Sequence, residues 1–161
     1  MARLDSTGAE AVIKQMRRLG QQAGPVAAAV LAAGAVEVRD AWRETIRARG
    51  YVDTGAMLRS ISFPARPKDN GGILSTEIAP KGKDASGTRN AEKAFILHYG
   101  TSRIPASYWV DEAEQAAEPR ANARMTAVWD EYMRTGTVPA VDTTDIYTAS
   151  GKGKRRKKTT T

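Results

Sequence analysis

Apolar residues recur at intervals of three or four in three stretches of the chain, the spacing that places side chains on one face of an α-helix. The first stretch ends at Gly20 and Gly24. Pro25 then suits the first turn of a second helix, because its missing amide would be unpaired there in any case. A third helix begins near Ser107 and ends at Gly136. The apolar positions are Val12, Ile13, Met16 and Leu19; then Leu31, Val38, Trp42 and Ile46; then Val110, Ala113, Ala117, Met125, Val128, Trp129 and Tyr132.

The second predicted helix, Val26–Arg49, is rich in alanine. Its small residues, 27–29 and 32–35, would let a neighbouring helix approach closely. Within the third helix, Pro119 predicts a kink or a break, because proline removes one helical hydrogen bond and clashes with the preceding turn.

Between the long helices the pattern changes to short alternating segments. Residues 60–63 alternate as a strand does, Asn70-Gly71-Gly72 is typical of a hairpin turn, and residues 73–79 form the returning strand. Residues 81–93 are charged and aperiodic, which predicts a mobile loop. Residues 94–99 predict a short helix, capped by Asn90 and closed by Gly100-Thr101.

This order of elements predicts an α+β fold in which a small antiparallel β-sheet packs against long α-helices. Residues 1–136 would form one core domain. Residues 137–161 show no helical stripe and would form an extended C-terminal arm. A small alanine-rich core buries little apolar surface, so contacts between subunits that bury more would help to stabilise the fold.

The chain of 161 residues has 25 Lys and Arg against 18 Asp and Glu, a formal net charge of +7. Taken alone, this charge suggests a nucleic-acid partner. Without the six positive charges of the tail, however, nineteen basic residues face 18 acidic ones, so the remainder is nearly neutral. The basicity therefore belongs to the tail, which would bind a polyanion or an acidic protein surface, or would only aid solubility. Its charged residues are Lys152, Lys154, Arg155, Arg156, Lys157 and Lys158.

Candidate chemistry is sparse. The chain has no cysteine and a single histidine, His98, with no acid or second histidine three or four residues away, so we interpret His98 as structural. A capped turn accounts for Asp53 and Thr54, and the sequence has no phosphate-binding loop. We therefore expect no catalytic residue, no metal and no cofactor: the protein is not an enzyme. Because the longest apolar run, Val26–Ala33, is too short for a membrane span, we also expect no membrane partner.

Two segments resemble the motifs of a known family. Residues 53–61, Asp-Thr-Gly-Ala-Met-Leu-Arg-Ser-Ile, resemble a D-T-G-x-L-x-x-S-I element of phage tail-component proteins, with Leu58 one residue later than the family's leucine. Residues 94–106 are similar to that family's hydrophobic-x-E-[FY]-G-T-S-x-x-P-A element, with His98 in place of the acid. The motif positions are Asp53, Thr54, Gly55, Leu58, Ser60, Ile61, Gly100, Thr101, Ser102 and Pro105.

The resemblance is to the minor tail, tail-completion and neck proteins of long-tailed double-stranded DNA phages. It implies a structural virion protein, assembled in the host cytoplasm, that forms a homo-oligomeric ring, expected to be a hexamer. Such a ring would join the head connector to the tail tube, or to a tail terminator, and genomic DNA would pass through its channel. The motifs look structural: Gly55 and Gly100 would set turns, and Thr54 and Thr101 would cap backbone groups. Leu58, Ile61, Phe95 and Trp109 would pack the sheet against the helix.

Two alternatives remain open. A tail terminator, which caps the tail tube, cannot be distinguished from a neck protein by these motifs. A small nucleic-acid-binding protein would use the basic tail, but it would also be expected to interleave aromatic and basic residues on a folded face, and the nearly neutral body lacks that pattern.

Overall fold

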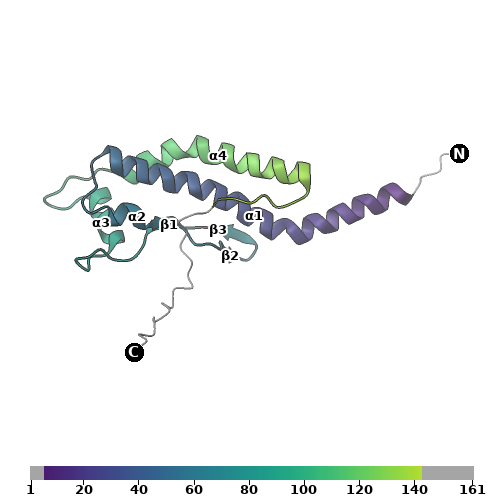
Figure 1. The fold of residues 1–161 in the computed structure, drawn as a ribbon, viewed down its shortest axis with the longest axis horizontal. Helices are drawn as coiled ribbons and strands as arrows, with labels where there is room; N and C mark the ends of the chain where they lie inside the picture. Colours follow the sequence, from purple (N-terminus) through teal and green to yellow (C-terminus); the bar gives the residue numbers. More distant parts are fainter. Residues whose placement is uncertain (1–5, 143–161) are drawn as a thin grey trace, which may run out of the picture.

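Two long antiparallel helices form the frame of the protein (Figure 1). The computed structural model describes residues 6–142. Helix α1 comprises Ser6–Ala48 and helix α4 comprises Trp109–Thr135. Two ion pairs follow their antiparallel course: Arg120 contacts Glu44 at 3.1 Å, and Arg49, just after α1, contacts Glu112 near the start of α4. The shorter elements lie between the two helices in the sequence. Helices α2 and α3 pack near the end where α4 begins, and the β2–β3 hairpin lies nearer the middle of α1 (Figure 1).

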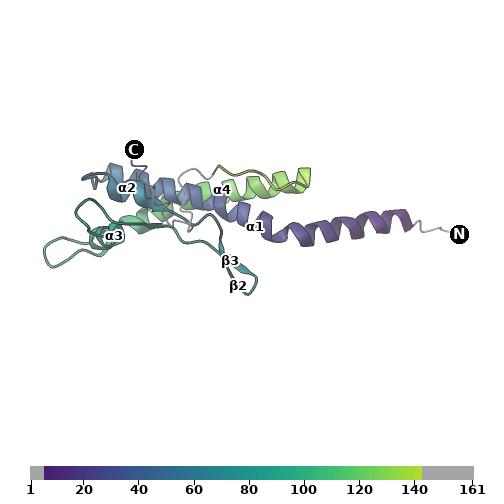
Figure 2. The same cartoon turned by 60° about the horizontal axis from the view of Figure 1, so that its bottom comes forward.

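The prediction of two helices separated at Gly20–Pro25 is wrong, because α1 is one continuous helix with Pro25 inside it. The helix changes direction along its length, and its N-terminal part points away from the rest of the protein (Figures 1 and 2). Proline costs an internal helix about 3 kcal/mol and typically bends it. Long hydrogen-bonded segments on both sides of Pro25 allow the helix to continue despite that cost.

Small side chains line the contact between α1 and α4, as the composition predicted. Gly34 comes so close to α4 that an added Cβ atom would stand 2.6 Å from the sulfur of Met125. The buried residues of α4 recur every three or four positions along one face. On α1 the buried positions include Val26, Ala33, Ala35 and Ala41, and on α4 they are Trp109, Ala113, Ala117, Ala121, Val128 and Tyr132.

The largest core side chains meet at one end of this helix pair. The rings of Trp42 and Trp109 lie edge to face, with centroids 5.3 Å apart and an interplanar angle of 79°. Such T-shaped pairs match the positive edge of one ring to the negative face of the other. Trp109 is completely buried, and the cluster around the two rings comprises Ile46, Met57, Ile61, Ala94 and Ala113.

The elements between the long helices are short. They are helix α2 (Ala56–Ser60), strands β1 (Ile61–Ser62), β2 (Lys68–Asn70), β3 (Ile73–Ser75) and β4 (Ala79–Pro80), and helix α3 (Asn90–Tyr99). Strand β1 pairs with β4, and β2 pairs with β3, both antiparallel. The α+β class is thus confirmed, but the single small sheet expected from the sequence is two separate two-stranded ladders.

The predicted hairpin turn is confirmed, since Gly71 and Gly72 connect β2 to β3 with positive φ angles of 67° and 89°. The predicted strands are shorter than expected. Ser60 ends helix α2 instead of starting a strand, and the pairing lapses between the two ladders. Pro67 lies just before β2, where proline cannot donate to a ladder.

Residues 81–93, predicted to be a mobile loop, are held by local hydrogen bonds. Lys83 and Arg89 form an isolated antiparallel bridge, and the carboxylate of Asp84 accepts the amide of Thr88 at 2.9 Å. Asn90 does not cap α3: it is the first helical residue, and its side-chain Nδ2 donates to the carbonyl of Lys81 at 2.8 Å. The composition of residues 81–93 showed that the segment is polar, but it could not show which polar groups contact one another.

Helix α4 continues through Pro119, so the predicted break is absent. It ends at Thr135, and Gly136 follows in the left-handed conformation with φ of 66°, a common helix terminus. The chain then turns back towards the middle of the molecule (Figures 1 and 2). The C-terminal arm lies outside the described residues from 143 onwards.

By length and composition alone, residues Leu19–Ala48 of α1 are apolar enough to cross a membrane, with a mean hydropathy of 1.3. From the sequence we considered only uninterrupted apolar runs and therefore expected no segment long enough to span a membrane. The mean hydropathy of a longer window includes this helix. The core helix of a soluble protein passes the same test. The segment is therefore weak evidence for a membrane span. Part of α1 packs against α4, and its C-terminal part carries charged residues from Glu37 to Arg47.

The α1–α4 contact leaves no room for a larger side chain at Ala117, which is completely buried. We predict that Ala117→Leu destabilises the protein by about 2 kcal/mol through overpacking. The neighbouring Ala116 is exposed, so Ala116→Leu is the matched control with the same change in helix propensity. The urea midpoint of both variants measures the difference. Equal midpoints would show that the two helices do not pack as described.

Candidate functional site: the corner formed by the two motifs

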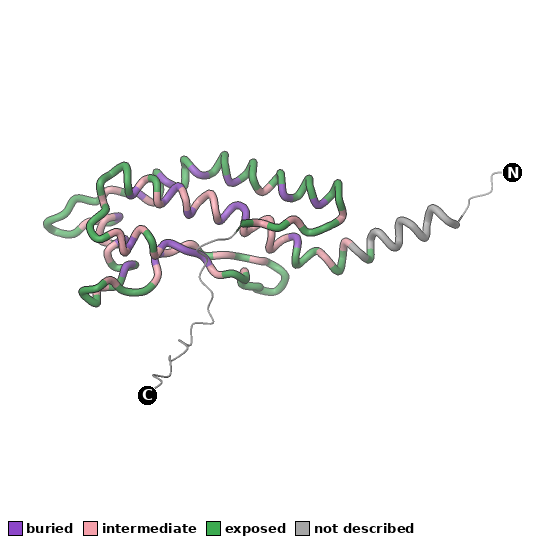
Figure 3. The backbone as a smooth tube through the Cα atoms, viewed as in Figure 1, coloured by how far each residue is buried: buried purple, intermediate pink, exposed green. Residues whose placement is uncertain are grey.

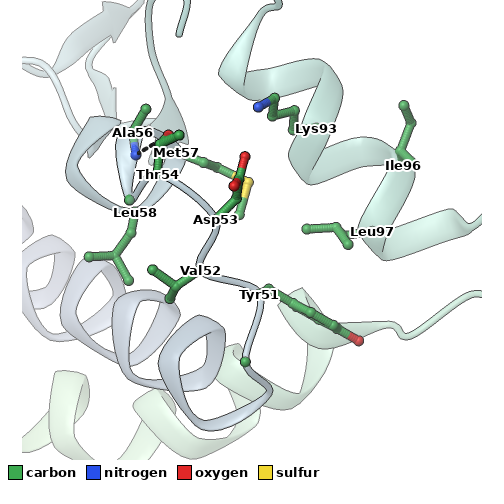
Figure 4. A pocket seen from close by; sticks show the side chains of 12 residues that line it. Tyr51, Val52, Asp53, Thr54, Ala56, Met57, Leu58, Lys93, Ile96 and Leu97 are labelled. Atoms are coloured by element: carbon green, nitrogen blue, oxygen red, sulfur yellow. Dashed lines mark hydrogen bonds between the residues drawn. The ribbon is translucent and has the colours of Figure 1, made fainter. Parts of the chain in front are cut away.

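The two motif segments, far apart in sequence, form the walls of one cavity of about 400 Å³ (Figure 4). One wall is the turn after α1 together with α2. The opposite wall is helix α3, at the end of the molecule where α4 begins (Figure 1). The lining residues are Gly50, Tyr51, Val52, Asp53, Thr54, Gly55, Ala56, Met57, Leu58, Lys93, Ile96 and Leu97.

The first motif is a turn that starts α2. Gly55 has φ of 72°, as its predicted turn role requires, and the hydroxyl of Thr54 accepts the amide of Ala56 at 3.4 Å (Figure 4). The hydroxyl of Ser60 donates to the carbonyl of Met57 at 2.7 Å. Asp53 is exposed and caps no helix in the described hydrogen bonds.

The buried hydrophobic positions of this motif differ slightly from the expectation. Ile61 is completely buried, as predicted, but Leu58 is only half-buried. Met57, immediately before it, points into the core instead and belongs to the cluster around Trp42 and Trp109. The direction in which α2 faces the core decides whether Met57 or Leu58 is buried. A five-residue helix is too short for its buried face to be predicted from the sequence pattern.

The second motif ends α3 in a sharp reversal at Gly100, which has φ of 75° and ψ of −173°. This backbone region is essentially restricted to glycine. A Cβ atom on Gly100 would stand 2.5 Å from the carbonyl oxygen of Ile104 and 2.6 Å from the amide of Ala106. Glycine is therefore required at this position for two independent reasons, conformation and space.

The residues after Gly100 close a compact loop. The hydroxyl of Thr101 accepts the amides of Arg103 and Ile104 at 3.2 and 3.1 Å, so its predicted capping role is confirmed. Its own amide donates to the carbonyl of Ile104 at 2.7 Å. Ser102 and Pro105 are exposed. The hydroxyl of Ser107 then donates to the carbonyl of Leu97 at 2.5 Å, which fastens the loop to α3.

His98 occupies the place of the family's acid and serves the start of α4. Its carbonyl accepts the amides of Ser107 and Tyr108, both at 3.1 Å. Its Nδ1 accepts the amide of Val110 at 3.4 Å, in the first turn of α4, where helix amides lack helical partners. The side chain is buried and its Nε2 lies 4.0 Å from Asp111. These contacts support the interpretation of His98 as a structural residue.

A polar network joins the end of α1 to the start of α4. Arg49 donates to the carboxylate of Glu112 through Nε at 2.9 Å and also through Nη2. Hydrogen bonds from Ser107 and Arg49 lower the pKa of Tyr51, because they stabilise its phenolate form. The segment just before the first motif is thus connected to the residues that follow the second.

The edge of the cavity at Lys93 is fixed by the preceding loop. The ammonium of Lys93 lies 2.5 Å from the carboxylate of Asp84, and Ser86 donates to the same carboxylate at 2.7 Å. These donors hold the pKa of Asp84 well below its usual range, and the same ion pair raises the pKa of Lys93.

This geometry suits packing better than chemistry. The cavity walls are mostly apolar, and Asp53 and Lys93 are the charged side chains among the lining residues. Within residues 6–142, no group of three or more histidine or acidic side chains is placed to hold a metal ion. The two motifs therefore define a structural corner that orients α3 and starts α4.

Phe95, predicted to pack in the core, instead lies on the surface with 61% of its area exposed. It begins a row of exposed aromatic side chains with Tyr99 and Tyr108, which are 57% and 56% exposed. A helix has one buried face, and here Ala94 and His98 occupy it, so Phe95 and Tyr99 project outwards. The six charged residues of the basic tail lie outside the described residues.

Structure and motifs together thus indicate a structural component with exposed apolar surface. Residues 10–110 match the family model described as "Bacteriophage HK97-gp10, putative tail-component". Since this match covers more than half of the sequence, the chain belongs to that family of phage tail components, which gives it a structural role in the virion tail. No curated protein and no solved structure matched the chain.

We predict that Gly100→Ala destabilises the protein by about 3 kcal/mol, because the new methyl group meets backbone atoms and the conformation excludes other residues. Gly50 also has a positive φ, 68°, but a Cβ atom there would meet nothing within 4 Å. Gly50→Ala is therefore the control, with an expected cost of about 1 kcal/mol. Chemical denaturation of both variants provides the measurement, and equal losses would contradict the described loop.

We also predict that His98→Gln keeps the stability within about 1 kcal/mol of the parent, because glutamine retains an acceptor for the amide of Val110. His98→Leu removes that acceptor at similar volume and should cost more. Thermal melting compares the two variants. Melting and assembly should be unchanged by a chelator, and a loss that zinc restores would overturn the structural interpretation of His98.

Proposed function

We propose that the protein is a subunit of the phage head–tail interface, a neck or tail-completion protein. In this role it forms a homo-oligomeric ring, expected to be hexameric, between the head connector and the tail tube. Genomic DNA passes through the channel of the ring. The observation that carries the proposal is the family match over residues 10–110, which gives a tail component.

The distribution of exposed apolar side chains supports assembly into a larger structure. One group lies on and after α3: Phe95, Tyr99, Ile104 and Tyr108. A second group, Trp129 and Met133, lies in the last turns of α4 at the opposite end of the helix pair (Figure 3 shows the exposed face of α4). Clustered exposed apolar surface typically marks contacts with other proteins.

Two alternative functions are consistent with parts of the same data. A tail terminator would also be a ring of tail-component subunits, and its position on the tail tube distinguishes it. A small nucleic-acid-binding protein would depend on the basic tail, but its aromatic surface on α3 is not flanked by a matching cluster of basic residues, since Asp111 and Glu112 follow directly.

The proposal predicts where the protein is found and what its loss does. Particles produced without it should contain filled heads and tails that are not joined, as seen by electron microscopy. Immunogold labelling should place the parent protein at the junction. Label at the tip of the tail, or joined particles in its absence, would contradict the neck assignment.

The C-terminal tail provides a separate prediction. Removing residues 151–161 should preserve the fold and weaken docking of the ring to its neighbour if the tail binds an acidic protein surface. The difference from the parent should be largest at low salt, because salt screens the attraction that the tail contributes. A tail of the same length with its six basic residues changed to Gln separates charge from length. The measurement is the yield of infectious particles as a function of salt. Unchanged yield for both variants would show that the tail only aids solubility.

A further inference from the structure

The N-terminal part of α1 extends beyond the end of α4 and lies clear of the other described elements (Figures 1 and 2). Its backbone is helical from Ser6. The sequence places Val12, Ile13, Met16 and Leu19 at the spacing of one helix face. The same segment carries Lys14, Arg17 and Arg18 against one acid, Glu10. By its sequence pattern this segment is a basic amphipathic helix, and no other described element lies beside its backbone (Figures 1 and 2).

An exposed aromatic surface lies at the other end of the molecule, on α3 and at the start of α4. We define the aromatic corner as Phe95, Tyr99 and Tyr108. The rings of Phe95 and Tyr99 are 4.7 Å apart, and the ring of His98 lies 4.3 Å from Tyr99 and 5.5 Å from Tyr108, so the three exposed rings form one continuous row.

Acidic side chains border the aromatic corner. Asp111 lies 4.0 Å from His98, and Glu114 and Glu118 continue along α4 on the side of a groove that Asp111 also lines. All three are exposed. An apolar row beside an acidic edge is complementary in charge and in apolar character to a basic amphipathic helix, a common form of peptide recognition.

We propose that the N-terminal part of α1 of one copy packs on the aromatic corner of the next copy. The two surfaces lie at opposite ends of the protomer (Figure 1), so they cannot meet within one chain. A contact between two different surfaces is head-to-tail, and its repetition closes into a ring when the rotation between copies permits. The inference rests on the proposed ring and names the surfaces that build it.

The absence of cysteine from the chain makes cross-linking unambiguous. The full-length double variant Met16→Cys/Phe95→Cys, treated with a short bismaleimide, should give a ladder of covalent multimers larger than the dimer. A mixture of the two single variants should give only the heterodimer, and neither single variant alone should cross-link. The pair Met16→Cys/Ile73→Cys is the control, since Ile73 is at least as exposed as Phe95 but lies on the β2–β3 hairpin.

If a different segment occupies the aromatic corner, or if the N-terminal helix binds elsewhere, the cross-linked products differ. If two N-terminal helices pair with each other, Met16→Cys alone forms a dimer. If the C-terminal tail occupies the aromatic corner, Phe95→Cys cross-links to Ser150→Cys instead of Met16→Cys. Either result overturns the proposed contact, as does the absence of any multimer both in purified protein and in assembled particles.

Truncation of the aromatic corner tests the contact without a cross-linker. Phe95→Ala with Tyr99→Ala should weaken self-association about tenfold or more, measured by analytical ultracentrifugation, because aromatic side chains dominate such contacts. Ile73→Ala removes an exposed apolar side chain elsewhere and should have no effect. If immunogold labelling finds the protein at the phage neck while these variants associate normally, the proposed contact is wrong and the proposed function stands. If the protein is absent from the virion, the proposed function itself is wrong.

Discussion

The close contact between α1 and α4 is the interaction on which the rest of the structure depends. Alanine and glycine at the interface let the two helices approach, and α2 and α3 pack near one end of this pair (Figure 1). The edge-to-face contact of Trp42 with Trp109 fixes that end, because it fills the space where the small residues stop. Without the pair, helices and strands as short as α2 and β1 have too little buried surface to be stable.

The two motifs complete this arrangement by controlling where the chain turns. Gly55 starts α2 and Gly100 ends α3, both with positive φ. The loop after Gly100 then places the amide of Val110 against His98, so that α4 starts at the position that brings Trp109 to Trp42. The motifs therefore act through geometry. Their effect on function is to set the outer surface of α3, which carries the exposed aromatic row.

Alanine is the most frequent residue of the core, and several large aromatic side chains lie on the surface instead. Phe95, Tyr99 and Trp129 are among the bulkiest residues of the chain, yet each is about half exposed or more. A monomer gains nothing from this exposure, whereas a subunit of an assembly does, since these side chains then bury area in contacts between proteins. Membership of a phage tail-component family agrees with this distribution.

The sequence by itself determined the long helices, the hairpin turn at Gly71-Gly72, the structural role of Gly55 and Gly100, and the family. These features depend on local periodicity and local backbone conformation, which neighbouring residues specify. Only the tertiary structure decided that α1 continues through Pro25, that Met57 and not Leu58 is buried, and that Phe95 faces outwards. Each of these depends on which face of a helix meets a distant partner, and no short-range pattern contains that information.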